Sequence, residues 1–199
     1  MKTILRLIHS CGLLALLGRA LAASAAPSIV VSVPEQKLAL VENSVVVAQY
    51  PVSTSKFGLG DANGSYRTPL GTMEVASKIG AHAPLGSVFK SRQRTGEVLP
   101  PNAPGRDPIV TRILWLRGLE AGNARAFERG IYIHGTPVEK LIGRPASYGC
   151  IRMRSRDVVR LFDAVPVGTK IDVVKAPLRR AIAEVYTQQQ LRTRHLAAN

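Results

Sequence analysis

Cys150 and His134 are the two side chains in this sequence whose types could form a nucleophile and its base. A thiol alone is only a few per cent ionised at neutral pH, and a neighbouring imidazole can accept its proton to leave a thiolate–imidazolium pair. Gly149, directly before the cysteine, allows backbone N–H groups to lie near the sulfur. Arg152 adds positive potential that favours a thiolate and can hold a carboxylate bidentately. We therefore predict a site built around a cysteine nucleophile.

Taken singly, the same residues have plainer explanations. A histidine after a strand is commonly structural, a cysteine beside a glycine commonly belongs to a core, and an arginine is commonly a solvated surface charge. A zinc site is a further alternative, but His82, His134 and His195 form no H-x-x-x-H spacing, and the sequence has no C-x-x-C pair. We therefore expect no metal and no cofactor, and we expect His82 to be non-catalytic.

Residues 1–25 have the order of a secretory signal peptide: a cationic start, an apolar stretch over 7–18, and small residues with an A-x-A pattern at Ala23 and Ala25. The apolar stretch is shorter than the roughly 20 residues that span a membrane. We therefore expect cleavage, with no transmembrane segment afterwards. Cys11 would leave with the signal peptide, so Cys150 would be an unpaired thiol in a compartment that favours disulfides. Such a thiol is buried and inert, paired between chains, or kept for its reactivity.

The charge of the chain predicts an anionic partner. The formal net charge is +14, and +11 would remain once Lys2, Arg6 and Arg19 are removed with the signal peptide. For an exported protein the expected partners are acidic wall polymers or membrane headgroups, and we expect no nucleic acid. The alternative is that the charge only aids solubility.

Short apolar segments bounded by turn residues predict a mainly β domain, sandwich-like or barrel-like, with little helix. We expect a helix over 156–165 with Ser155 as its N-cap, and a basic helical tail over 178–197. Residues 80–110, rich in Gly, Pro and basic side chains, are predicted to form a long loop, either a substrate-side lid or a variable solvated segment. Residues 42–44 are predicted to be a three-residue hairpin loop. The expected strands are 29–33, 37–41, 45–49, 71–78, 111–117, 130–134 and 168–174.

The sequence also resembles a known family. His134-Gly135-Thr136, followed sixteen positions after the histidine by Cys150 within Ser-x-Gly-Cys-Ile-Arg-Met, resembles the signature of the L,D-transpeptidase catalytic domain, the YkuD-like family. Residues 52–55, 67–73 and 165–173 resemble other segments of that family, so the resemblance covers about residues 28–175. The sequence departs from the family pattern at Ser55, Met73 and Tyr148.

This resemblance implies a mixed β-sandwich and a reaction. The cysteine attacks the peptide bond after the diamino acid of a peptidoglycan tetrapeptide stem, releases the terminal D-alanine and forms a thioester. An amine on a second stem, or on an anchored protein such as an outer-membrane lipoprotein, then resolves the thioester. The resemblance thus implies peptidoglycan stem peptides as partners and the periplasm as the location. The implied domains are a signal peptide at 1–25, the catalytic domain at 26–176 and the tail at 177–199.

The resemblance also assigns roles to the motif residues. His134 deprotonates the nucleophile and later the incoming amine, and the backbone carbonyl of Gly135 orients its ring. The backbone N–H groups around Tyr148 to Cys150, including Gly149, are assigned to an oxyanion hole. Ser147 and Arg152 are assigned to steadying the site, and Arg152 also to contact with the substrate.

Two alternatives remain open at this point. The same cysteine and histidine could deliver the thioester to water, giving an L,D-carboxypeptidase or a hydrolase that detaches wall-linked protein. From a different class, the chain could be a non-catalytic basic module that binds the wall polymer or a nucleic acid and has an inert thiol.

Overall fold

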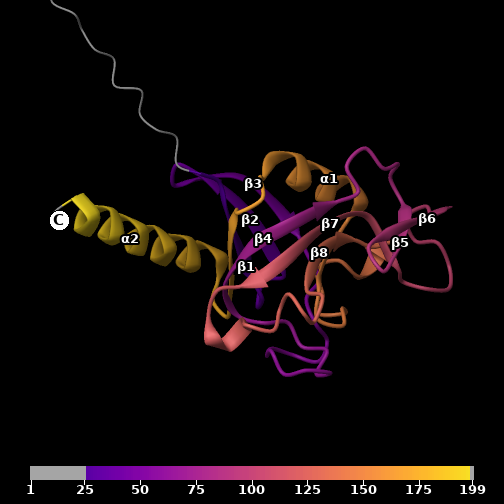
Figure 1. Ribbon diagram of the computed structural model, residues 1–199, viewed down its shortest axis with the longest axis horizontal. Helices are drawn as coiled ribbons and strands as arrows, with labels where there is room; N and C mark the ends of the chain where they lie inside the picture. Colours follow the sequence, from indigo (N-terminus) through magenta and orange to yellow (C-terminus); the bar gives the residue numbers. More distant parts are fainter. Residues whose placement is uncertain (1–25, 198–199) are drawn as a thin grey trace, which may run out of the picture.

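The computed structural model describes residues 26–197, with the side chains after Thr187 described only for Leu191. The predicted signal peptide lies outside the described residues and stays a prediction. Within them, ten strands form one mixed sheet (Figure 1). The strands are β1 (Ser28–Ser32), β2 (Lys37–Glu42), β3 (Val45–Pro51), β4 (Gly71–Ile79), β5 (Ser87–Lys90), β6 (Gln93–Val98), β7 (Ile109–Gly118), β8 (Tyr132–Gly135), β9 (Ile151–Met153) and β10 (Lys170–Val174).

The sheet has the order β3-β2-β1-β10-β4-β7-β5-β6, and β8 joins β9 to β7. β1 pairs with β10 and β8 pairs with β9 in parallel, whereas the other pairs are antiparallel. Every predicted strand is present, with ends that shift by at most two residues. The mainly β, mixed-sheet prediction is therefore confirmed.

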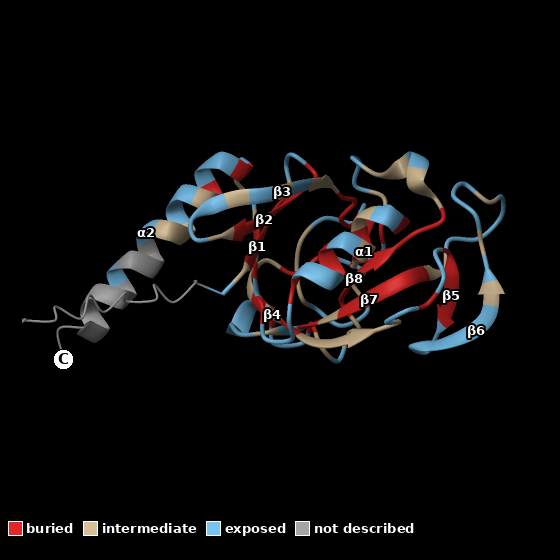
Figure 2. Cartoon of the chain, turned by 90° about the horizontal axis from the view of Figure 1, so that it is seen from above, coloured by how far each residue is buried: buried red, intermediate tan, exposed pale blue. Residues whose placement is uncertain are grey.

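The main core contains the inward side chains of the two parallel strand pairs, β1–β10 and β8–β9, and of one helix. α1 (Ser155–Ala164) buries Val158, Leu161 and Phe162, whose spacing places them on one helical face. Ile133 of β8 and Ile151 of β9 belong to the same buried cluster. Figure 2 shows these buried segments side by side in the centre of the molecule. Burial of each such side chain is worth about 1.5–3 kcal/mol, so the core fixes β8 and β9 firmly.

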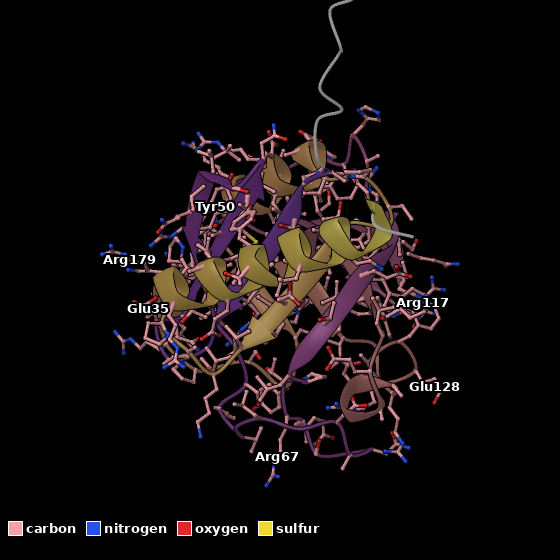
Figure 3. The ribbon with its side chains drawn as sticks, turned by 90° about the vertical axis from the view of Figure 1, so that its left-hand side faces the viewer. Glu35, Tyr50, Arg67, Arg117, Glu128 and Arg179 are labelled. Atoms are coloured by element: carbon pink, nitrogen blue, oxygen red, sulfur yellow. The ribbon has the colours of Figure 1, made fainter. Side chains whose placement is uncertain are left out.

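α2 (Leu178–Ala197) forms the predicted C-terminal helix, and its first turns pack on the sheet. Leu178 and Ala181 are buried against residues of β1 and β2, whereas the helix then runs away from the strands (Figure 1). The carboxylate of Glu35 accepts a hydrogen bond of 2.6 Å from the backbone N–H of Leu178, which satisfies one free donor of the helix start. Figure 3 shows Glu35 and Arg179 at this end of the helix.

The prediction of one long loop over 80–110 was wrong. β5 and β6 form a hairpin there that pairs with β7, and only the remaining residues are irregular (Figure 1). The connecting residues Ser91 and Arg92 both have positive φ, 49° and 68°. Two-residue turns of this kind usually contain Asn or Gly, so Ser91 and Arg92 do not indicate a turn by their residue types. Residues 42–44 likewise form a two-residue turn, at Asn43 and Ser44, and not the predicted three-residue loop.

The predicted N-cap was also wrong. Ser155 is the first helical residue, Arg154 is the cap, and no side chain of the cap makes a hydrogen bond. Glu139 instead reaches across and accepts a 2.8 Å bond from the N–H of Ser155, whose hydroxyl is engaged by Thr111. No helix among the described residues is long and apolar enough to cross a membrane.

Candidate functional site

The parallel pair β8–β9 brings His134 and Cys150 to one place in the sheet. His134 lies beside Arg152, and Ile133 lies beside Ile151. Extending this register by one residue places Cys150 beside Tyr132, diagonally across from His134. With strands about 4.8 Å apart and about 6.6 Å of rise over two residues, the two Cα atoms lie roughly 8 Å apart. The imidazole and the thiol extend from the same face of the pair, because side chains alternate along a strand.

The turn before Cys150 is buried at Ser147 and Gly149 and is held by hydroxyl groups. The Ser147 hydroxyl donates to the carbonyl of Cys150 at 2.6 Å and accepts from the N–H of Gly149 at 3.2 Å. The Thr68 hydroxyl donates to the carbonyl of Gly149 at 2.9 Å and accepts from the N–H of Ser55 at 3.0 Å. Ser147 and Thr68 are almost fully buried, so these bonds satisfy backbone groups that water cannot reach. The Ser147 hydroxyl therefore joins two peptide groups of the turn, and Thr68, which the sequence analysis did not single out, joins the turn to Ser55.

Gly149 has a backbone conformation that only glycine adopts readily. Its φ is +118°, and an added Cβ would lie 3.3 Å from the Ile131 side chain and 3.4 Å from the carbonyl oxygen of Arg67. The N–H of Gly149 donates to the Ser147 hydroxyl, so it is not free to bind an oxyanion. The N–H groups of Tyr148 and Cys150 remain as the candidate oxyanion donors.

His134 is buried, and its ring orientation is fixed by its own neighbour. Nδ1 lies 2.7 Å from the carbonyl oxygen of Gly135. A carbonyl oxygen can only accept, so Nδ1 carries the proton and donates it. Nε2 is then the unprotonated nitrogen, which is the form that a general base requires. The arrangement at Gly135 is the one that the resemblance implied.

Burial opposes charge on both members of the pair. It lowers the pKa of His134 to about 4, although the hydrogen bond to Gly135 acts in the opposite direction. Burial also raises the pKa of Cys150 to about 11, against smaller lowering effects from the Tyr132 backbone and the charge of Arg129. The resting protein at neutral pH therefore holds a neutral thiol and a neutral imidazole, and not the ion pair that residue chemistry alone suggested.

A pocket of about 150 Å³ opens onto Cys150. Tyr66 and Tyr148 line it together with Arg129, Gly130 and Ile131, among other residues. The thiol lies on its wall, 3.4 Å from the carbonyl oxygen of Gly130. His134, Gly135 and Arg152 do not line this pocket, so it approaches the sulfur from the side of the Tyr66 loop.

Arg129 fixes that side of the pocket. Its Nη1 donates to the Gly60 carbonyl at 3.1 Å and to Asp61 at 2.8 Å, and its Nη2 donates to the Arg67 carbonyl at 2.7 Å. Both Arg129 and Asp61 have side chains less than one tenth exposed. Figure 3 shows Arg67 at the outer edge of this loop. The ion pair thus fastens residues 60–67 over the pocket.

Arg152 is buried and only partly satisfied. Its Nη1 pairs with Asp107, whose carboxylate also accepts a bond from Thr136. Its Nε and Nη2 have no hydrogen-bond partner among the described residues. Burial lowers the pKa of Arg152, yet a guanidinium stays charged in proteins. Three N–H groups of this buried guanidinium, one on Nε and two on Nη2, are therefore without an acceptor among residues 26–197.

The structure brings most of the predicted residues together. His134 and Arg152 lie on the pair β8–β9 and Cys150 directly precedes β9, whereas Tyr148 is exposed and lines the pocket, and His82 is exposed in a turn. No group of three or more His, Cys, Asp or Glu side chains suited to a metal exists among the described residues. The sequence analysis did not single out five residues of the site: Asp61, Tyr66, Thr68, Asp107 and Arg129. Thr68 lies in a segment that resembles the family, and its position there could have indicated it. The ion pairs of Asp61 and Asp107 join residues far apart in the sequence, and such pairs leave no local pattern.

We expect Cys150 to react slowly with iodoacetamide at pH 7, and we expect the rate to rise toward pH 11. Burial holds the pKa of the thiol at about 11, and only the thiolate is nucleophilic. Mass spectrometry of the alkylated protein across pH 6–11 measures this profile, with Cys150→Ala as the control for side reactions. A rate that is already at its plateau by pH 7 would contradict a neutral resting pair.

We expect His134 to make the fold less stable in acid. Its pKa is about 4 when folded and 6.5 when unfolded, so between these values the unfolded chain binds more protons. The free energy of unfolding is therefore unaffected by the protonation of this histidine above pH 6.5. It decreases by at most roughly 3 kcal/mol as the pH falls toward 4, because protonation then favours the unfolded chain. Urea unfolding at pH 7.5 and pH 4.5 tests this, because His134→Asn should show a smaller loss between the two pH values than the unaltered protein.

We expect Arg129→Gln to loosen the loop over residues 60–67 and to raise the pKa of Cys150 further. Removing one member of a buried pair costs about 3–5 kcal/mol, since Asp61 would stay buried and charged. Amide hydrogen exchange of the loop and the alkylation profile of Cys150 are the two measurements. The matched control is Arg117→Gln, which removes an exposed partner of Glu74 and should cost less than about 1 kcal/mol. Equal changes in hydrogen exchange and in the alkylation profile for the two substitutions would refute a structural role of Arg129 in holding the 60–67 loop.

Comparison with known proteins agrees with this geometry. The model of the L,D-transpeptidase catalytic domain (YkuD) matches residues 26–173. The probable L,D-transpeptidase ErfK/SrfK of Escherichia coli strain K12 is 31% identical over 155 residues, which cover 76% of this chain and 45% of that protein. The probable L,D-transpeptidase YcfS of the same strain is 30% identical over 141 residues, which cover 69% of this chain and 40% of that protein. The chain thus spans less than half the length of these curated relatives.

A solved structure shares the fold. The crystal structure of the L,D-transpeptidase from Xylanimonas cellulosilytica has a TM-score of 0.50 at 21% identity, covering 77% of this chain and 62% of that one. The family match takes in every strand described above together with His134 and Cys150. From this extent of agreement we conclude that the chain belongs to the L,D-transpeptidase catalytic-domain family.

Proposed function

We propose that this protein is a peptidoglycan L,D-transpeptidase in which Cys150 forms a thioester with a tetrapeptide stem and passes it to an amine. One observation carries the proposal: Cys150 lies on the wall of an open pocket, and on the same strand pair the proton of His134 is fixed on Nδ1, so Nε2 can accept the thiol proton. Membership of the family gives the reaction class, and the residue roles are our assignment.

The first step begins from two neutral groups. His134 takes the proton of Cys150 as the sulfur attacks the carbonyl carbon of the diamino acid, so charge develops only as the bond forms. The tetrahedral oxyanion accepts bonds from the N–H groups of Tyr148 and Cys150, each worth about 3 kcal/mol. The peptide bond then breaks, the protonated His134 returns its proton to the leaving amine, and D-alanine departs. Thioester formation and loss of D-alanine balance the step.

Arg152 supplies the charge that a stem peptide requires. We assign the unpartnered Nε and Nη2 of this buried guanidinium to a substrate carboxylate, because charge-assisted bonds of this kind are stronger than neutral ones. Arg152 does not line the pocket beside Tyr66, so this carboxylate must reach it from another side, after a local opening of the site. Asp107 holds Nη1 and compensates part of the buried charge while the site is empty. Arg152 therefore acts in substrate positioning and not in proton transfer.

In the second step an amine attacks the thioester. His134, neutral again, takes the proton of the incoming amine, and the thiol is regenerated with a proton. A diamino acid of a second stem gives a cross-link between stems, and an amine on an outer-membrane lipoprotein gives an anchored protein. The location that fits this substrate is the periplasm, reached through the predicted signal peptide, and the basic charge of the chain suits the carboxylates of the wall.

Incubation of the purified protein with disaccharide-tetrapeptides tests the proposal. We expect dimers joined through two diamino acids together with free D-alanine, and we expect Cys150→Ala to lose the activity completely. His134→Gln keeps a neutral side chain of similar size but removes the base, so we expect a loss of about 10²–10⁴-fold. Product separation by chromatography with mass spectrometry measures both.

The products separate this proposal from its alternatives. Tripeptide without dimer would show that water resolves the thioester, as in an L,D-carboxypeptidase. A wild-type protein that forms no thioester, and also forms no covalent adduct with a carbapenem, would support a non-catalytic wall-binding module instead.

A further inference from the structure

Three aromatic side chains lie together on the surface beside the Cys150 pocket. Phe57, Tyr66 and Tyr148 are 44%, 56% and 59% exposed. Their ring centroids lie 5.5 Å apart for Phe57 and Tyr148 and 5.9 Å apart for the other two pairs. We call these three residues the aromatic platform. Exposed apolar surface that is gathered in one patch usually marks a binding site.

Lys56 gives the platform a polar rim. Its ammonium group donates a 3.0 Å hydrogen bond to the hydroxyl of Tyr148 and lies 4.3 Å from the centre of that ring. It also lies 5.2 Å from the centre of the Phe57 ring. The cation–π contacts hold Lys56 against the rings, so a charged donor stays at the edge of an apolar surface.

The platform is continuous with the pocket of the nucleophile. Tyr66 and Tyr148 belong to the platform and also line the pocket that opens onto Cys150. Tyr148 is two residues from Cys150, so their Cα atoms lie within about 8 Å of each other. A ligand whose reacting carbonyl sits at the sulfur could therefore place its distal part on the rings.

We propose that the aromatic platform binds a sugar ring of the glycan strand that carries the donor stem peptide. The inference rests on the proposed function, and it names a part of the substrate away from the reacting bond. A pyranose ring has apolar C–H faces that suit the faces of aromatic rings, and hydroxyl groups that suit Lys56 and the tyrosine hydroxyls at the rim. The stem itself offers small and charged residues, which do not require three exposed rings.

The reach of the stem agrees with this placement. The reacting carbonyl belongs to the third residue of the stem, and three extended residues span about 10 Å. Tyr66 and Tyr148 line the same pocket as Cys150, so a stem of this length can extend from the sulfur across the pocket to the rings. The sugar is thus bound outside the pocket, where rings are exposed, while the peptide occupies the pocket.

The test compares acylation of Cys150 by a disaccharide-tetrapeptide with acylation by the free tetrapeptide, followed by intact-protein mass spectrometry. We expect the wild type to acylate about tenfold more efficiently (kcat/KM) with the sugar-linked substrate. Phe57→Ala and Tyr148→Ala should bring this ratio towards one. Tyr148→Phe keeps the ring and should retain most of the preference. Leu85→Ala, at an exposed apolar residue of another groove, is the matched control and should leave the ratio unchanged.

The outcomes separate this inference from the proposal on which it rests. A wild-type ratio near one, with both substrates acylating Cys150, would overturn the sugar site and leave the transpeptidase proposal standing. A tenfold ratio that persists in Phe57→Ala and Tyr148→Ala would also overturn it, because the preference would then arise elsewhere. No acylation with either substrate would contradict the transpeptidase proposal itself.

Discussion

The constraint on which the site depends is that a buried, irregular turn must still satisfy its backbone hydrogen bonds. Ser147 and Gly149 of the turn 147–150 are buried, and some of the peptide groups of this turn have no strand partner, so hydroxyl side chains form hydrogen bonds with them. Ser147 joins the two ends of the turn, and Thr68 joins it to the neighbouring segment at Ser55. An orphaned buried donor or acceptor costs about 1–3 kcal/mol, so replacing either hydroxyl would move the backbone that presents Cys150. The position of the nucleophile is in this sense a product of hydrogen-bond satisfaction.

The same burial that fixes the turn also determines the charge state of the site. Because His134 and Cys150 both lie in a low-dielectric environment, neither is charged in the resting protein. A neutral thiol reacts slowly with disulfides and oxidants, because these reactions require the thiolate. In the exported enzyme that we propose, this suppression would protect the unpaired cysteine, because reactivity would arise only when a substrate carbonyl accepts the sulfur and the proton moves to His134.

The sequence allowed most strands to be predicted, because they leave local patterns, and it also marked Cys150 and His134 as candidate site residues. Alternating or continuous apolar runs predicted β1 to β4 and β7, and the spacing of His134 and Cys150 predicted their juxtaposition once β8 and β9 pair in parallel. The β5–β6 hairpin escaped because Ser91 and Arg92 adopt a turn that usually uses Asn or Gly. The start of α1 escaped because a distant carboxylate, that of Glu139, replaces a local cap. The charge states of His134 and Cys150 escaped because burial is a property of the fold and not of residue type.

Two buried arginines near the nucleophile show how the fold gives one residue type two roles. Arg129 donates from both terminal nitrogens to the 60–67 loop and to Asp61, so its charge is compensated and its work is structural. Arg152 has Asp107 on Nη1 alone, and its Nε and Nη2 have no partner among residues 26–197. A buried guanidinium in that condition is costly unless something outside the chain completes it. That difference separates an arginine that builds the wall of the pocket from one to which we assign a substrate carboxylate, and it could not be predicted from the type or the spacing of either residue.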